Sequence, residues 1–216
     1  MEFTGFTPET IDFLWGIRFN NNREWFEAHK KQYQETLYMP MKALAQELIP
    51  VLKEAPELEC KVSRIYRDSR LHPSTPYKES LWICFRRGDL MWGEQPVYFF
   101  ELTPDKYSYG FLYWFPRPAK MEQFRRQLAE NPKPFLAIVE ALKVSGLSLS
   151  SECYKRPKPC DTPMLQSYFQ MKNMGCYREF AVGDRLFTKN LSGDILTTFD
   201  QLKPLYSYVK LFNDKM

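Results

Sequence analysis

The stretch PVYFFELTPDKYSYGFLYWF, residues 96–115, contains two aromatic-rich runs separated by a turn. The runs are residues 96–102 and 107–115, and Thr103-Pro104-Asp105-Lys106 between them has the composition of a tight turn. Aromatic and β-branched residues favour strands, so the stretch predicts a β-hairpin. Together with a β-prone run at residues 81–86, it predicts one antiparallel sheet of aromatic-rich strands.

Helical patterns precede this sheet. Thr7 is placed to cap a helix that has Pro8 at its first position. The Asn20-Asn21-Asn22 run predicts a break, after which Asn21 or Asn22 caps a second helix. The second helix should end at Met39-Pro40, where a third begins.

Further helices and short strands follow the hairpin. Residues 118–130 and 192–212 have the apolar spacing of helices, and Pro204 should kink the second of these. Residues 147–154 and 178–182 are candidate strands. Helices, then strands, then helices indicate an α+β fold, with helices packed against one face of the sheet. We expect a single domain over residues 1–216.

Composition narrows the class of protein. The chain has 216 residues, of which 44% are hydrophobic, so it has enough apolar side chains for a packed core and is not a disordered chain. A net charge of +4 is low for a dedicated nucleic-acid binder. No stretch approaches the roughly 20 apolar residues of a membrane span, and the N-terminus does not have the pattern of a signal peptide.

The cysteines and histidines argue against a metal centre and for a reducing compartment. Five cysteines without a CxxC pair, and only two histidines, make a structural zinc site improbable. Reduced thiols in a cytoplasmic protein are the simplest interpretation. We therefore expect no metal, no cofactor and no contact with a membrane, and we expect the thiols to be buried or idle.

The stretch KVSRIYRDSRLHPSTPYK, residues 61–78, is the strongest candidate for a site. It sets five cations against one carboxylate, and arginine forks match the oxygens of phosphate or carboxylate groups. β-branched residues favour a strand over residues 62–70, which would place Arg64, Tyr66, Asp68 and Arg70 on one face. A helix over the same residues would instead group Arg64, Arg67, Asp68 and Leu71. The candidate ligand-binding residues are Arg64, Arg67, Asp68, Arg70, Tyr77 and Lys78.

A structural interpretation of the same residues stays open. An Arg-Asp-Arg group also serves to brace a sheet against a helix, with Glu24 or Glu79 as a counter-charge. His29 lies on the apolar face of its predicted helix and is favoured as a boundary histidine. His72 is the freer candidate for proton transfer, although the sequence shows no partner for it.

Several blocks together resemble a known family. Phe3-Thr4-Gly5-Phe6, Asn21-Asn22-Arg23-Glu24-Trp25-Phe26, Arg64-Ile65-Tyr66-Arg67-Asp68-Ser69-Arg70 and Thr75-Pro76-Tyr77-Lys78 follow one another as in the bacterial family catalogued as domain of unknown function 2461. The resemblance covers about residues 3–180. It implies a cytoplasmic α+β domain, and it implies no established activity, cofactor or catalytic residue.

The sequence supports two functional hypotheses and identifies no reaction. The first is an anionic, most plausibly phosphorylated, small molecule bound by the stretch 61–78. The second is a non-enzymatic module for nucleic acid or a protein partner, motivated by basic residues interleaved with aromatic ones at Arg86-Arg87, Arg125-Arg126, Lys155-Arg156 and Lys158. Whether the protein is an enzyme, and its oligomeric state, are left open.

Overall fold

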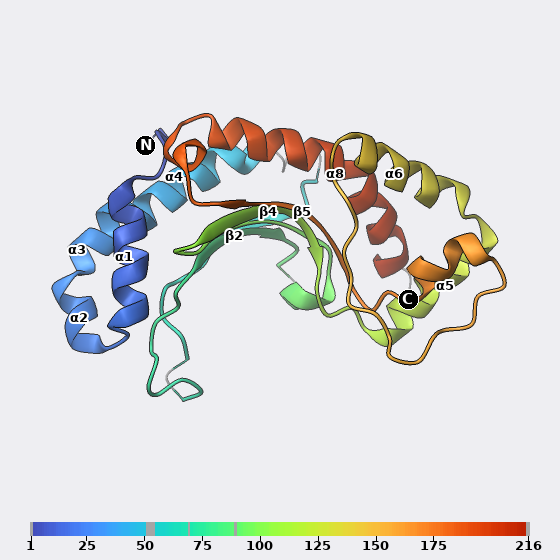
Figure 1. Ribbon diagram of the computed structural model, residues 1–216, viewed down its shortest axis with the longest axis horizontal. Helices are drawn as coiled ribbons and strands as arrows, with labels where there is room; N and C mark the ends of the chain where they lie inside the picture. The colour runs from blue at the N-terminus through green and yellow to red at the C-terminus, as the bar shows by residue number, and fades with distance from the viewer. Residues whose placement is uncertain (1, 51–54, 69, 89, 215–216) are drawn as a thin grey trace. The chain divides into compact units, whose positions relative to one another are not determined.

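The structure, a computed structural model, describes residues 2–50, 55–68, 70–88 and 90–214 (Figure 1). It is an α+β fold, as the order of the sequence patterns predicts. Its α-helices are α1 (Pro8–Phe19), α2 (Arg23–Ala28), α3 (Lys30–Gln32), α4 (Met39–Leu48), α5 (Pro118–Glu130), α6 (Lys133–Val144), α7 (Gln166–Phe169) and α8 (Leu191–Asp214). A π-helix, η1 (Tyr33–Tyr38), joins α3 to α4, and 3-10 turns lie at η3 (Trp92–Glu94), η4 (Pro163–Leu165) and η5 (Asp184–Phe187).

Five strands form one antiparallel sheet in the order β1-β2-β3-β4-β5. They are β1 (Glu59–Val62), β2 (Leu81–Arg86), β3 (Val97–Leu102), β4 (Lys106–Tyr113) and β5 (Met174–Ala181). The predicted hairpin between β3 and β4 is confirmed: Thr103 N–H donates to the Lys106 carbonyl at 2.9 Å. The predicted strand at residues 81–86 coincides with β2, and the one at 178–182 overlaps the second half of β5.

The chain divides into two compact units, and β3, β4 and β5 contribute residues to both. One comprises Met1–Phe85, Phe99–Tyr109 and Glu179–Thr197, and the other comprises Arg86–Tyr98, Gly110–Arg178 and Thr198–Met216. In the first unit the ring of Phe100 stacks on Phe6 at 5.9 Å. In the second, Tyr98 packs on Phe199 and Tyr206 of α8, at 5.0 and 4.9 Å. Each unit therefore buries aromatic side chains of β3.

Helix ends follow the sequence where a proline or an asparagine marks them. Pro8 begins α1, and Asn22, not Asn21, caps α2: its Oδ1 accepts the Trp25 N–H at 2.9 Å. Pro118 begins α5, whose inward residues Met121, Phe124 and Leu128 are fully buried, as expected. Pro204 lies inside α8, which continues beyond it to Asp214.

Two local predictions are wrong. Residues 147–154 form no strand and make only isolated bridges, at Ser150 with Gly175 and at Cys153 with Met171. Met39-Pro40 does not separate two helices, because the helical chain runs from η1 directly into α4.

A hydrogen bond from another helix explains why Pro40 is tolerated there. In an α-helix the N–H of residue 40 would bond to the carbonyl of residue 36, and proline has no N–H. The hydroxyl of Thr10, which is fully buried on α1, donates instead to the Thr36 carbonyl at 2.6 Å. The Thr36 carbonyl thereby has a donor from α1 that does not depend on residue 40.

Candidate anion-binding site

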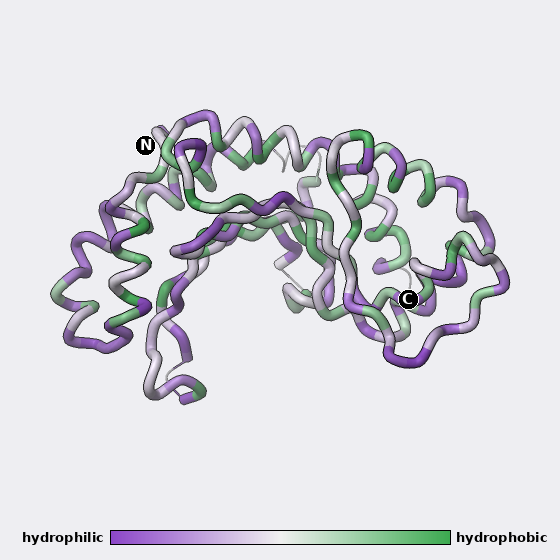
Figure 2. Tube along the Cα trace, in the orientation of Figure 1, coloured by the Kyte–Doolittle hydropathy of each residue, from purple (hydrophilic) through white to green (hydrophobic). Residues whose placement is uncertain are grey.

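Residues 63–78 form an arm that leads from β1 to β2; Figure 1 shows it as the long teal loop extending beyond the start of β2. Its two sides are held together by sparse backbone pairing. Arg67 N–H donates to the Pro76 carbonyl at 2.8 Å, and Lys78 N–H donates to the Ile65 carbonyl at 2.7 Å. Apart from Ile65 and Leu71 the arm is mostly hydrophilic (Figure 2).

The predicted strand over residues 62–70 is wrong, because β1 ends at Val62. Beyond it only one bridge forms in the described part of the arm, between Tyr66 and Tyr77. The expected common face of Arg64, Tyr66, Asp68 and Arg70 therefore does not exist as a strand face.

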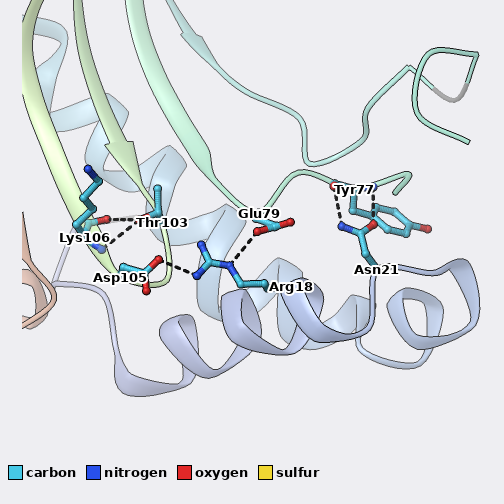
Figure 3. A network of polar contacts seen from close by, with 7 residues as sticks. All are labelled: Arg18, Asn21, Tyr77, Glu79, Thr103, Asp105 and Lys106. Atoms are coloured by element: carbon cyan, nitrogen blue, oxygen red, sulfur yellow. Dashed lines mark hydrogen bonds and ion pairs between the residues drawn. The ribbon is translucent and has the colours of Figure 1, made fainter. Parts of the chain in front are cut away.

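The base of the arm is fixed to the first helices. The ring of Tyr77 is buried and stacks on Phe26 of α2, with centroids 4.2 Å apart. The carboxamide of Asn21 bonds to both backbone groups of Tyr77, at 3.0 Å each (Figure 3). Tyr66 meets Phe26 edge-on at 5.5 Å and keeps about half of its surface exposed. Tyr77 thus acts as an anchor in the core and lies away from solvent.

Asp68 and Arg70 pair with each other at the far end of the arm. Arg70 Nε and Nη2 donate to the two carboxylate oxygens of Asp68, at 3.0 and 2.7 Å. The Arg70 hydrogen bond holds the pKa of Asp68 below its usual value. The Arg70 side chain is 86% exposed, and its partner is only two residues away in the chain, so this pair does not brace the sheet.

The remaining cations of the stretch lie near the base of the arm. Lys78 Nζ donates to the Arg64 carbonyl at 2.7 Å, and Arg67 Nη1 donates to Thr75 Oγ1 at 3.2 Å. Among the residues that the structure describes, no carboxylate forms an ion pair with any of them. We refer to them as the basic cluster: Lys61, Arg64, Arg67 and Lys78.

The other three cations of the basic cluster act on the charge of Lys78. Burial lowers the pKa of the Lys78 ammonium, and the positive charges of Arg67, Lys61 and Arg64 lower it further. Its Nζ also lies 5.8 Å from the ring centroid of Trp82 on β2, a side chain that the sequence did not mark as part of a site. The cluster therefore combines mutually repelling cations with one half-buried aromatic ring.

A second polar group beside the arm was not foreseen from the sequence (Figure 3). Arg18 of α1 donates to Glu79 at 2.8 Å through Nε and to Asp105 of the β3–β4 turn at 2.7 Å through Nη1. Its guanidinium also lies 4.8 Å from the ring of Trp15. Glu79, which the sequence offered as a counter-charge for the arm, is thus paired with Arg18.

The other candidate groups are engaged or poorly suited to chemistry. His29 stacks on Trp25 at 4.0 Å and its Nδ1 lies 2.8 Å from the Trp25 carbonyl, which is the arrangement of a boundary histidine. The cysteines are free thiols, and burial raises the pKa of Cys60 to about 11 and that of Cys176 to about 12. These two thiols are protonated near neutral pH and are poor nucleophiles.

Two kinds of feature are absent from the part of the chain that the structure describes. None of the helices placed there is long and apolar enough to cross a membrane. Nor does any group of three histidine, cysteine or acidic side chains gather there as ligands for a metal ion.

These features define an α+β protein with an aromatic antiparallel sheet and a basic arm fixed to its first helices. The family model described as "Conserved hypothetical protein (DUF2461)" matches residues 9–208, nearly the whole chain. The chain belongs to this family, as the resemblance of its Asn-Asn-Arg and Arg-x-Tyr-Arg blocks indicates. The comparison with curated proteins finds no match.

Proposed function

We propose that the protein binds a phosphate-bearing small molecule at the basic cluster. The observation that carries the proposal is the uncompensated charge: Arg67, Lys61 and Arg64 lie near enough to Lys78 to lower its pKa, and no described carboxylate pairs with the four cations. Like charges held together raise the free energy of the folded protein. A bound dianion would relieve this repulsion.

The chemistry of the cluster suits phosphate. Arg64 and Arg67 present planar forks that bind two oxygens of one phosphate group, and Lys78 supplies a compact positive charge. The Lys78 ammonium is already held by the Arg64 carbonyl, so little of its freedom remains to be lost on binding. Trp82 gives the site one flat apolar wall.

The alternative hypothesis, a nucleic-acid surface, has less support. Arg87 pairs with Asp214 at 2.6 Å, and the buried Arg125 donates to the carbonyls of Phe169 and Met171. Arg87 is therefore engaged within the protein, and Arg125 is buried, so neither guanidinium lies open to a nucleic-acid backbone. A small phosphorylated ligand is the simpler proposal, and oligonucleotides belong in its test.

The test is a thermal-shift and calorimetric screen against nucleotides, sugar phosphates, polyphosphates and short oligonucleotides. At a hundredfold excess over Kd a ligand should stabilise the folded state by about 2.7 kcal/mol. The double variant Arg64→Gln/Arg67→Gln should lose at least about tenfold in affinity, because each charged hydrogen bond contributes about 1.5–3 kcal/mol.

Arg70→Gln is the matched control for this experiment. It removes an arginine from the same arm, but one that is 86% exposed and already paired with Asp68. Its affinity should stay within about twofold of the unmodified protein. An equal loss in Arg70→Gln would show non-specific charge attraction, and the absence of any phosphorylated ligand would end the proposal. Binding of oligonucleotides alone, falling steeply with salt, would favour the alternative.

We also propose the cytoplasm as the compartment of the protein. The support is that none of its five cysteines, all in the described residues, forms a disulfide, and that Cys84 and Cys176 are buried. Reducing conditions keep cysteines in this state.

A further inference from the structure

A second group of cations surrounds one tyrosine ring, far along the chain from the arm. Arg125 of α5 lies 5.1 Å from the ring centroid of Tyr154, Lys158 Nζ lies 5.0 Å from it, and Lys172 Nζ lies 5.7 Å from it. All three distances are within the range of a cation–π interaction. We refer to Arg125, Lys158 and Lys172 as the Tyr154 cluster.

Arg125 is built into the protein as a fixed charge. Its side chain is 5% exposed, and its Nε and Nη2 donate to the carbonyls of Phe169 and Met171 at 2.9 and 3.0 Å. The third nitrogen, Nη1, lies 3.1 Å from Glu122 Oε1 but is not directed at it, so this buried atom has an ion-pair partner and no hydrogen-bond acceptor. A buried guanidinium with an unused donor is costly unless an anion completes it.

Two glutamines hold the backbone of Lys158. Gln170 accepts the Lys158 N–H at 2.8 Å, and its own amide donates to the Lys158 carbonyl at 3.1 Å. Gln166 donates to the same carbonyl at 3.3 Å. The backbone of Tyr154 is tied to residue 170 as well, by an N–H bond of 3.0 Å. The cluster is therefore preorganised by bonds that involve none of its charges.

The charges of this cluster do not balance. Glu122 pairs with Arg125 and also with Lys158, at 3.3 Å, whereas Lys172 pairs with no carboxylate in the described part of the chain. Three cations against one carboxylate leave two positive charges around one ring. The Glu122 side chain is 45% exposed and belongs to the surface of α5, so it is free to move away.

We propose that the Tyr154 cluster is a second anion-binding site, which takes a dianionic phosphate group in place of the Glu122 carboxylate. In this arrangement Glu122 occupies the position of the ligand when none is bound. A phosphate oxygen would accept from Arg125 Nη1 and from the Lys158 and Lys172 ammonium groups, and its two negative charges would offset more of the positive charge than the single charge of Glu122 does. Tyr154 holds the cations in place through its ring.

The substitution Glu122→Gln tests the proposal because it changes affinity in a distinctive direction. If Glu122 competes with the ligand, its removal should tighten the binding of inorganic phosphate about fivefold or more. Glu140→Gln on α6 is the matched control: Glu140 also pairs three residues ahead, with Lys143 at 3.6 Å, and its loss changes the net charge equally. Its phosphate affinity should not change.

Lys172→Gln should have the opposite effect and weaken phosphate binding at least about fivefold. All titrations are performed by calorimetry in the Arg64→Gln/Arg67→Gln background, so that the basic cluster of the arm does not contribute. Melting curves verify that each variant is folded. Unchanged or weaker binding in Glu122→Gln, or an equal gain in Glu140→Gln, would overturn the proposal and leave Glu122 a structural partner. Either result is independent of whether the arm binds a ligand.

Discussion

The carboxamide of Asn21 bonds to the backbone of Tyr77 as a neighbouring strand would. Its Nδ2 donates to the Tyr77 carbonyl and its Oδ1 accepts the Tyr77 N–H, both at 3.0 Å (Figure 3). One side chain in the turn between α1 and α2 thereby satisfies both polar groups of a buried residue 56 positions away. The base of the arm is held in place by this clamp.

Asn21→Ala should therefore lower the free energy of unfolding by about 1–3 kcal/mol, because both backbone groups of Tyr77 lose their partner. Asn20→Ala is the control, since the Asn20 side chain makes an exposed bond to the Gly16 carbonyl, at 3.0 Å. It should cost no more than about 0.5 kcal/mol. Urea denaturation of the two variants measures the difference, and equal losses would show that the clamp contributes nothing.

The hydroxyl of Thr10 should be needed because residue 40 is a proline. Thr10→Val removes the hydroxyl bond to the Thr36 carbonyl and should cost about 1–3 kcal/mol, whereas Thr10→Ser keeps the hydroxyl and should cost less. Pro40→Ala restores a backbone N–H near that carbonyl. In the Pro40→Ala background Thr10→Val should therefore cost less, by about 0.5–1 kcal/mol in a double-mutant cycle. Strictly additive effects would refute the coupling.

Substitution by alanine should change the stability of the protein in opposite directions at two glycines of the first unit. Gly5 has a φ of +112°, and a Cβ there would lie 2.4 Å from the Phe187 carbonyl oxygen. Gly5→Ala should lower stability by about 3 kcal/mol, through strain and a backbone clash. Gly193 lies in α8, where an added methyl group would meet no described atom within 4 Å, so Gly193→Ala should raise stability by about 0.5–1 kcal/mol. Thermal unfolding of both variants gives the two signs.

Arg18 should contribute more to stability than a typical surface arginine. It is 29% exposed and joins α1 to both Glu79 and Asp105, whereas Arg117 is 68% exposed and pairs only with Glu94 among the described residues. Arg18→Met should cost about 1–2 kcal/mol and Arg117→Met no more than about 0.5 kcal/mol, after screening by solvent. Denaturation at low and high salt distinguishes them, and similar costs would mean that the Arg18 network is only a surface feature.

As the pH is raised, phosphate binding at the arm should weaken at a lower pH than it would with a lysine of ordinary pKa. The pKa of Lys78 is lowered from its usual 10.5 by burial and by three neighbouring cations. As the pH rises through this lowered pKa, the ammonium loses the charge that an anion needs, so affinity falls. Between the two pKa values the unfolded chain binds more protons at Lys78, so the free energy of unfolding rises with pH there.

Lys78→Arg isolates this effect, because a guanidinium stays charged throughout the range. Calorimetric titrations with phosphate at increasing pH should show a smaller alkaline loss of affinity in this variant. Lys61→Arg is the control, because Lys61 is the other lysine of the cluster. If Lys78→Arg and the unmodified protein lose affinity in parallel, Lys78 does not contact the anion.

Much of the fold could be predicted because its signals are local. The bounds of α5 follow from Pro118 and from Asn131, and β2 follows from five apolar residues in a row, 81–85, before Arg86. β1 was not predicted, because four residues of mixed polarity carry no clear period. The candidate strand at 147–154 has a suitable composition, but its partners at Met171 and Gly175 pair with single residues only.

The candidate site could be predicted only in part. Charge density along residues 61–78 was sufficient to mark the region, and it includes Arg64, Arg67 and Lys78. The sequence could not show that the chain turns after Asp68. The carbonyl of Asp68 accepts the N–H groups of Leu71 and His72, at 3.0 Å each. This turn carries Arg70 back toward Asp68 at the far end of the arm. The role of Asn21 was also hidden, since a distant backbone group decides it.

The π-helix between α3 and α4 has a consequence for how chains of this family are compared. Its bonds span five residues, as between the Met39 N–H and the Gln34 carbonyl, so the segment contains about one residue more than an α-helix over the same axial length. Each residue of an α-helix turns it by about 100°, from 3.6 residues per turn. A relative that lacks that residue would keep Phe26 and Leu44 on their present faces only by straightening the segment into regular helix. In an alignment of two family members, a single-residue gap within Tyr33–Tyr38 would thus mark a change from π-helix to α-helix. The packing of the flanking helices would be conserved.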